Sequence, residues 1–134
     1  MVETTVRIFV ADDSASDVFL VRRALKQQGI AHDLTVAHDG EEALRLLGEI
    51  ENIPPQLILL DLSLPKVDGG QILAYIRRAP AFDGTVVIVL TTSESPRDLD
   101  MVRRLGALYF QKPGDLSSYM LLGQVIEDAL RTNT

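Results

Sequence analysis

Short apolar runs alternate with amphipathic stretches along this chain. The runs are dense in valine, isoleucine, leucine and other strand-favouring residues, and runs this short and apolar indicate buried strands. They cover Val6–Ala11, Leu34–Ala37, Leu57–Asp61, Thr85–Leu90 and Leu108–Gln111. Leu57-Ile58-Leu59-Leu60 is apolar at every position, which is typical of a parallel strand buried on both faces.

The segments between these runs repeat apolar residues at helical spacing and begin with capping residues. Ser14 or Asp13 can cap the first helix, and Asp39 can cap the second. The apolar face of the first helix includes Val21 and leaves Asp17 facing water. The predicted helices are Ala15–Gln28, Asp39 to about Gly48, Gly70–Arg78, Pro96–Leu105 and Leu116–Arg131.

Strands that alternate with helices predict an α/β fold, a parallel sheet with helices on both faces. Five such units suit a doubly wound five-stranded sheet in the order 2-1-3-4-5, the flavodoxin-like arrangement. A chain of 134 residues is the size of one domain. We therefore expect residues 1–134 to form a single domain with no output domain.

Polar residues follow the apolar runs of four of these strands. Asp12 and Asp13 follow the first strand, Asp61 ends the third, Thr91 follows the fourth and Lys112 follows the fifth. The carboxyl ends of parallel strands meet at one edge of a sheet, where ligands bind in open α/β folds. We expect these side chains to surround one crevice.

Carboxylates gathered in one crevice repel each other, and a hard divalent cation relieves the repulsion. Mg²⁺ takes oxygen ligands and keeps several waters. Asp13 and Asp61 could supply side-chain oxygens, the carbonyl of Ser63 could supply another, and Asp12 could hold a ligand water. The sequence therefore predicts a magnesium site.

The same crevice suits phosphoryl transfer, in which a protein mainly positions groups and stabilises charge. Lys112 would bring an ammonium group and Thr91 a hydroxyl donor. Asp61 is central among the acids, so its carboxylate is the natural nucleophile and would form an aspartyl phosphate.

The residues that carry this chemistry, in this order, resemble the response regulator receiver domain of two-component systems. The matching motifs are Asp12-Asp13, Asp61, Leu64-Pro65-Lys66-Val67-Asp68-Gly69, Leu90-Thr91 and Lys112-Pro113. The stretches from 12 to 18 and from 90 to 93 resemble in particular stand-alone receivers that partner phytochrome histidine kinases.

This resemblance implies that Asp61 accepts a phosphoryl group from a sensor histidine kinase in a Mg²⁺-dependent His–Asp phosphorelay. It implies that Thr91 and Lys112 contact the phosphoryl oxygens and that Tyr109 is an aromatic switch that follows Thr91. It also implies a cis bond between Lys112 and Pro113. Such a protein is not an enzyme beyond its own phosphorylation and dephosphorylation, and its output is protein–protein contact. We expect a homodimer through the fourth helix, the fifth strand and the fifth helix.

Simpler interpretations remain for single residues. Asp12 and Asp13 alone could cap a helix, Thr91 could be an ordinary strand-end residue, Lys112 could be solvated and Tyr109 could serve packing alone. A receiver-like docking module that is never phosphorylated is an alternative function. A phosphohydrolase with an aspartyl nucleophile is another, but such enzymes typically carry a second acid where Ser63 stands.

Composition narrows the partners and the compartment. Acidic residues outnumber basic ones, 19 to 13, and the net charge of −6 argues against nonspecific nucleic-acid binding. No apolar run approaches the roughly 20 residues that span a bilayer. The chain has no cysteine, so a cytoplasmic protein is expected. The net charge and the short apolar runs together predict neither a nucleic-acid nor a membrane partner.

Overall fold

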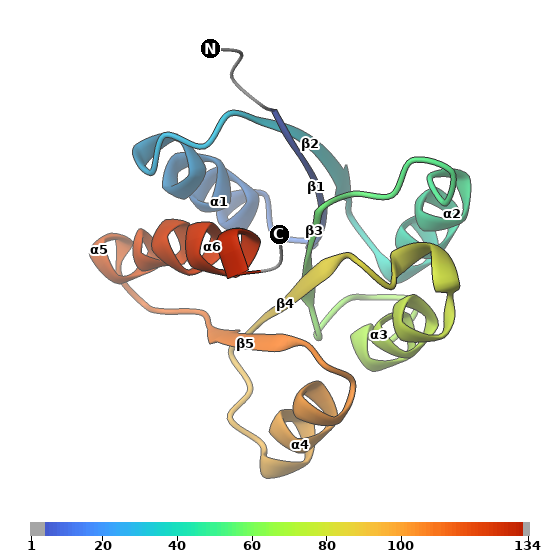
Figure 1. The fold of residues 1–134 in the computed structure, drawn as a ribbon. Coiled ribbons are helices and arrows are strands. Elements are labelled where there is room, and N and C mark those ends of the chain that lie inside the picture. The colour runs from blue at the N-terminus through green and yellow to red at the C-terminus, as the bar shows by residue number, and fades with distance from the viewer. Residues whose placement is uncertain (1–4, 133–134) are drawn as a thin grey trace.

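A computed structural model describes residues 5–132, and its strands form one parallel sheet in the order β2-β1-β3-β4-β5 (Figure 1). The predicted fold class and strand order are confirmed. The strands are β1 (Val6–Ala11), β2 (His32–Ala37), β3 (Leu57–Asp61), β4 (Val86–Thr91) and β5 (Leu108–Gln111). β2 begins before the predicted Leu34 because His32 already pairs with Val6 of β1.

The helices lie between the strands as predicted, with ends that differ by a residue where capping residues stand. They are α1 (Ala15–Gln27), α2 (Gly40–Glu49), α3 (Gly69–Arg78), α4 (Pro96–Arg104), α5 (Leu116–Tyr119) and α6 (Leu121–Thr132), with a short 3₁₀ turn at Pro80–Phe82. The Ser14 hydroxyl accepts a hydrogen bond from the Asp17 N–H and caps α1. Asp39 caps α2 in the same way, by accepting from the Glu42 N–H.

The prediction of one helix over Leu116–Arg131 is wrong, because the helix is divided at Met120 into α5 and α6. The N–H of Gly123 donates to the Met120 carbonyl three residues back, a tighter bond than the four-residue spacing of an α-helix. Gly123 also faces the backbone of α1, where an added Cβ would lie 2.6 Å from the Ala24 carbonyl oxygen. This glycine therefore allows α6 to pack directly on α1.

The central strands β1, β3 and β4 are largely buried, and they alternate their side chains between two cores. On one face α1, α5 and α6 cover the sheet, and α2 and α3 cover the other (Figure 1). The first core includes Ile8, Val10, Val21, Leu25, Leu59, Ile88, Leu122 and Ile126. The second includes Phe9, Leu47, Ile58, Leu60, Ile72, Leu73, Val89 and, from α4, Val102. Within the part of the chain that is described, no helix combines the length and apolarity needed to cross a membrane.

Candidate functional site

The strand register brings the predicted site residues to one level at the carboxyl edge of the sheet. Ala11 lies opposite Leu60, and Asp61 lies opposite Leu90. Asp12 therefore follows β1 beside the end of β3, and Thr91 ends β4 next to them. Asp12, Asp61 and Thr91 are buried, whereas Asp13 is exposed. The crevice predicted from the sequence exists.

Lys112 reaches this edge from the end of β5 and lies among three carboxylates. Its Nζ donates to Asp61 Oδ2 at 3.0 Å and to Asp17 Oδ2 at 2.8 Å. It also lies 3.0 Å from Asp12 Oδ2, a contact with ion-pair distance but without hydrogen-bond geometry. The ammonium group thus links the end of β5 to the ends of β1 and β3 and to the first turn of α1.

The prediction that Asp17 faces water is wrong. Its side chain is 22% exposed and makes the shortest of the three contacts with Lys112. A signal was present in the sequence, because Ser14 at the cap fixes Asp17 in the first turn of α1. That turn begins at the carboxyl edge of the sheet, so its residues border the crevice.

The implied cis bond between Lys112 and Pro113 is also wrong, since residues 5–132 contain no cis peptide bond. The trans chain still delivers the ammonium group, because the Lys112 N–H donates to the Thr91 carbonyl and continues the β4–β5 pairing. This bond holds the backbone of Lys112 against the end of β4.

Burial and charge act on the site in opposite directions. Burial raises the pKa of the Asp12 carboxyl, although the Ser14 N–H and the Lys112 ammonium both favour its charged form. Burial alone would lower the pKa of Lys112, but the surrounding Asp17, Asp12 and Asp61 outweigh it and raise that pKa. The lysine is therefore charged at neutral pH.

Three of the acids could hold a divalent cation. Asp12, Asp13 and Asp61 each offer a carboxylate oxygen, and these atoms lie within 4.8 Å of one another. Asp12 Oδ2 is buried and has no hydrogen-bond partner among residues 5–132, so it has a lone pair available for a ligand or its water. An all-oxygen donor set suits a hard cation. The Ser63 N–H donates to Asp61 Oδ1 at 2.9 Å, which places Ser63 beside the phosphoacceptor candidate.

Thr91 and Tyr109 are linked through one residue of the loop after β4. Thr91 Oγ1 accepts a hydrogen bond from the Ser93 N–H, and the Tyr109 hydroxyl donates to the Ser93 carbonyl. The Ser93 hydroxyl in turn donates to Asp98 of α4. The side chain of Tyr109 is half-buried and packs against the core beside α4. Hydrogen bonds through Ser93 therefore connect Thr91 to Tyr109 and to α4.

The loop after β3 is packed tightly against the site. An added Cβ at Gly69 would lie 2.6 Å from the Asp61 carbonyl oxygen and 2.5 Å from Leu62 Cα. Lys66 adopts a φ of 71°, and its ammonium group lies 3.4 Å from Asp39 Oδ2 at the start of α2. Glycine at position 69 is thus needed for close packing behind Asp61, in addition to any role in the turn.

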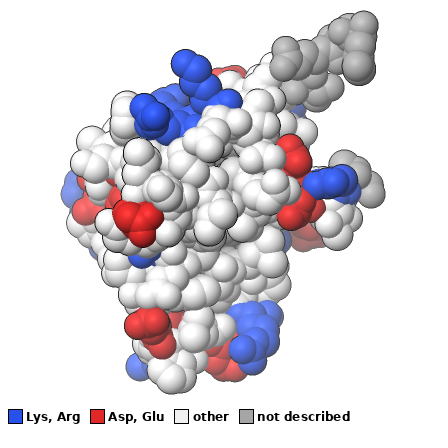
Figure 2. Space-filling view, turned by 90° about the vertical axis from the view of Figure 1, so that its left-hand side faces the viewer, with Lys and Arg blue, Asp and Glu red and all other residues white. Residues whose placement is uncertain are grey.

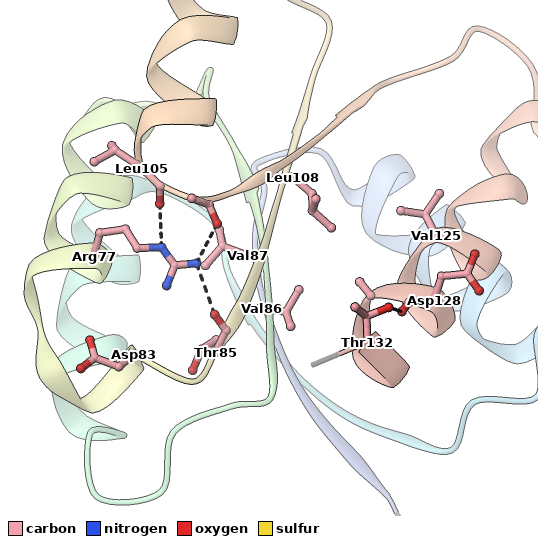
Figure 3. Close-up of a pocket in the computed structure, with 12 residues that line it drawn as sticks. Arg77, Asp83, Thr85, Val86, Val87, Leu105, Leu108, Val125, Asp128 and Thr132 are labelled. Atoms are coloured by element: carbon pink, nitrogen blue, oxygen red, sulfur yellow. Dashed lines mark hydrogen bonds between the residues drawn. The ribbon is translucent and has the colours of Figure 1, made fainter. Parts of the chain in front are cut away.

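A cavity of about 780 Å³ lies at the opposite end of the sheet, between α3, the starts of β4 and β5, and α6 (Figure 3). Its one arginine, Arg77, donates to backbone carbonyls, among them those of Leu105 and Thr85. The guanidinium group therefore has a structural role, because its hydrogen bonds join the end of α3 to the segments before β4 and β5. This cavity is separate from the acidic crevice, and no sequence motif pointed to it.

Together, the 2-1-3-4-5 sheet and an edge that carries paired acids, threonine and lysine define a signalling receiver. The chain belongs to the response regulator receiver domain family, whose sequence profile matches residues 8–120. It is thus a receiver of a two-component system, as the resemblance implied.

Particular relatives share most of the chain. It is 40% identical over 125 residues to response regulator Rcp1 of Synechocystis sp., covering 90% of this chain and 85% of Rcp1. The crystal structure of the Mn²⁺-bound form of Rcp1 aligns with a TM-score of 0.82 and 38% identity over 92% of both chains. The phosphorylated cyanobacterial phytochrome response regulator RcpA aligns with a TM-score of 0.85 and 33% identity, covering 98% of this chain and 97% of RcpA.

Proposed function

We propose that Asp61 accepts a phosphoryl group from a phosphohistidine of a sensor histidine kinase. The observation that carries this proposal is the position of the Asp61 carboxylate, buried at the sheet edge and 3.0 Å from the Lys112 ammonium. Asp12 and Asp13 lie beside it within metal-binding distance.

In the proposed step, an Asp61 carboxylate oxygen forms a bond to phosphorus while the bond from phosphorus to the histidine nitrogen breaks. The imidazole keeps the bonding electron pair and takes up a proton. The Lys112 ammonium group is placed to donate to a phosphoryl oxygen. Thr91 Oγ1 accepts from the Ser93 N–H, so its own proton can be donated to another oxygen.

The proposed metal is Mg²⁺, bound by the side chains of Asp13 and Asp61 and by the Ser63 carbonyl, with Asp12 holding a ligand water. When bound, this ion supplies positive charge to the phosphoryl oxygens. The cluster of three carboxylates and the buried Asp12 Oδ2, which lacks a hydrogen-bond partner among residues 5–132, support this assignment. A relative, Rcp1, has a Mn²⁺-bound form, which fits a divalent ion in this position.

The proposed partner is a sensor kinase of the phytochrome type, because RcpA is described as a phytochrome response regulator. The first helix offers a surface for such contact. Phe19 is 58% exposed, and the Arg23 guanidinium lies over its ring. Phe19 and Arg23 line a hollow on the surface of α1, together with Arg22 and Lys26. Figure 2 shows basic side chains gathered at the top of the face that includes α1, on a protein with net negative charge.

The proposed output is a shift of Thr91 toward the phosphoryl group, followed by Tyr109. Thr91 and Tyr109 both bind Ser93, and Ser93 binds Asp98 of α4. A change at Thr91 therefore alters the surface of α4 and β5. We propose that this surface, together with α5 and α6, which make up the fifth predicted helix, forms a homodimer.

The decisive test is phosphorylation of the Asp61→Asn variant by acetyl phosphate and Mg²⁺, measured by phosphate-affinity electrophoresis. The parent should incorporate acid-labile phosphate, and the variant should incorporate none, because the amide is a poor nucleophile. Asp33→Asn, which changes an exposed acid near the other end of the sheet, should react like the parent.

Incorporation into Asp61→Asn at the parent's rate would refute the assignment. A parent that takes up no phosphate and binds no Mg²⁺ would favour a docking module. Sustained turnover of phosphate esters would instead indicate a phosphohydrolase.

A further inference from the structure

Asp17 is a third acid at Lys112 that the proposed chemistry does not use. It comes from the first turn of α1, whereas Asp12 and Asp61 come from strand ends. Its Oδ2 lies 2.8 Å from Lys112 Nζ, closer than either of the other two carboxylates. Among residues 5–132 the candidate metal-binding group consists of Asp12, Asp13 and Asp61, so Asp17 lies outside it.

The ammonium group of Lys112 is already engaged in this structure. It has three N–H donors. It donates to Asp17 and Asp61 and faces Asp12 at 3.0 Å. A phosphoryl group converts the Asp61 carboxylate into an acyl phosphate and brings further oxygens that need a donor, so Lys112 must divide its donors between these oxygens and the two remaining carboxylates, Asp12 and Asp17.

Burial decides which contact is released. The side chain of Asp12 is 1% exposed, and a buried carboxylate that loses its cation is costly. Asp17 is 22% exposed, so water can replace Lys112 around its carboxylate. Asp17 is therefore the partner that Lys112 leaves most readily, and the free energy of that contact opposes the phosphorylated state.

We propose that Asp17 is a positioning residue that competes with the phosphoryl group for Lys112 and thereby limits the stability of phosphorylated Asp61. This inference rests on the proposed function of Asp61. It gives the first turn of α1 a part in setting how far the protein is phosphorylated at a given donor concentration.

The test uses beryllofluoride, an analogue of the phosphoryl group, on the full chain at fixed Mg²⁺, with binding followed by ¹⁹F NMR. Asp17→Asn keeps the side-chain shape, and the cap of α1 survives because it uses the backbone N–H of residue 17. The half-saturating beryllofluoride concentration should fall about threefold to fivefold, the upper size expected for one partly exposed charged contact. The control Asp33→Asn should change it by less than about twofold.

A second measurement separates direct competition from a general loss of negative charge. At roughly 1 M salt, charges separated by more than about 3 Å of solvent are largely screened. The gain from Asp17→Asn should persist there if it comes from the contact with Lys112. A gain that disappears in salt, an unchanged affinity or a weaker affinity would each overturn the competition. A parent that binds no beryllofluoride would instead overturn the proposed function of Asp61.

Discussion

Lys112 is the residue on which the acids of the site depend. Only 10% of its side chain is exposed, and its ammonium group is the cation that contacts Asp12, Asp17 and Asp61. Removing one member of a buried ion pair costs more than the pair contributes, because the remaining charge stays buried without compensation. In the absence of metal, Lys112 therefore has a structural role in addition to its proposed chemical role.

Lys112→Met should lower the free energy of unfolding by about 3 kcal/mol in metal-free protein, because buried Asp12 and Asp61 lose their cation. Mg²⁺ should restore part of this loss by supplying another positive charge. Urea denaturation with EDTA and with Mg²⁺ measures both effects. The control Lys66→Met removes an exposed ion pair to Asp39 and should cost less than about 0.5 kcal/mol.

The pH dependence of this difference follows from the raised pKa of Lys112. A lysine with a higher pKa in the folded state contributes its full stabilisation below the unfolded value, near 10.5, and loses it as the pH rises through the folded value. The gap between parent and Lys112→Met should therefore stay constant up to about pH 10.5 and shrink above it. Equal stability of the two proteins at neutral pH without metal would contradict the role assigned to Lys112.

The connection from β3 to α3 is the element whose packing holds Asp61 in place. Gly69 lies against backbone atoms of Asp61 and Leu62, which cannot move aside as a flexible side chain could. The first turn of α3 is thus fixed directly behind the proposed phosphoacceptor.

Gly69→Ala should lower the free energy of unfolding by about 2 kcal/mol, because the new methyl group overpacks this contact. It should also slow phosphorylation by acetyl phosphate, since the Asp61 backbone must shift. Gly48→Ala is the matched control, because nothing lies within 4 Å of its Cβ position in α2. That change should stabilise the protein by about 0.5 kcal/mol. Denaturation measures the free energy of unfolding of both variants. Equal changes in this free energy would show that the close approach at Gly69 is unimportant.

Most elements were predictable because each is encoded locally. The central strands β3 and β4 are nearly continuous apolar runs, and Ser14 and Asp39 mark helix starts by their capping chemistry. The division of the last helix was not predictable, since it depends on the fit of Gly123 against Ala24, far away in sequence. The strand-end residues of the site followed from topology, whereas the contact of Asp17 with Lys112 joins segments 95 residues apart.

At the scale of the whole molecule, the two ends of the sheet differ in kind. The carboxyl edge gathers ionisable groups, while the other end holds a cavity whose arginine is bound to carbonyls (Figure 3). β5 is one of the two edge strands and pairs with β4 only from Ile88 onward. Leu108 at its start and Leu116 of α5 are large exposed apolar residues on the proposed dimer surface.

Beryllofluoride with Mg²⁺ should shift the protein from monomer toward dimer, as measured by light scattering coupled to size exclusion. Leu116→Lys should weaken this association by about tenfold or more, because it buries a charge without a partner. Ile53→Lys alters another exposed apolar residue, which follows α2, and should leave association unchanged. A parent that stays monomeric in both conditions would remove the proposed dimer.

The separation of Lys112 from Asp17 by 95 residues has a consequence for synthesis. A ribosome releases Asp12, Asp17 and Asp61 well before the lysine that neutralises them, so a nascent chain that stops short of β5 carries mutually repelling acids. Lys112 is held beside these acids by the pairing of β5 with β4. A product that lacks β5 therefore also lacks the cation of the proposed phosphoacceptor site.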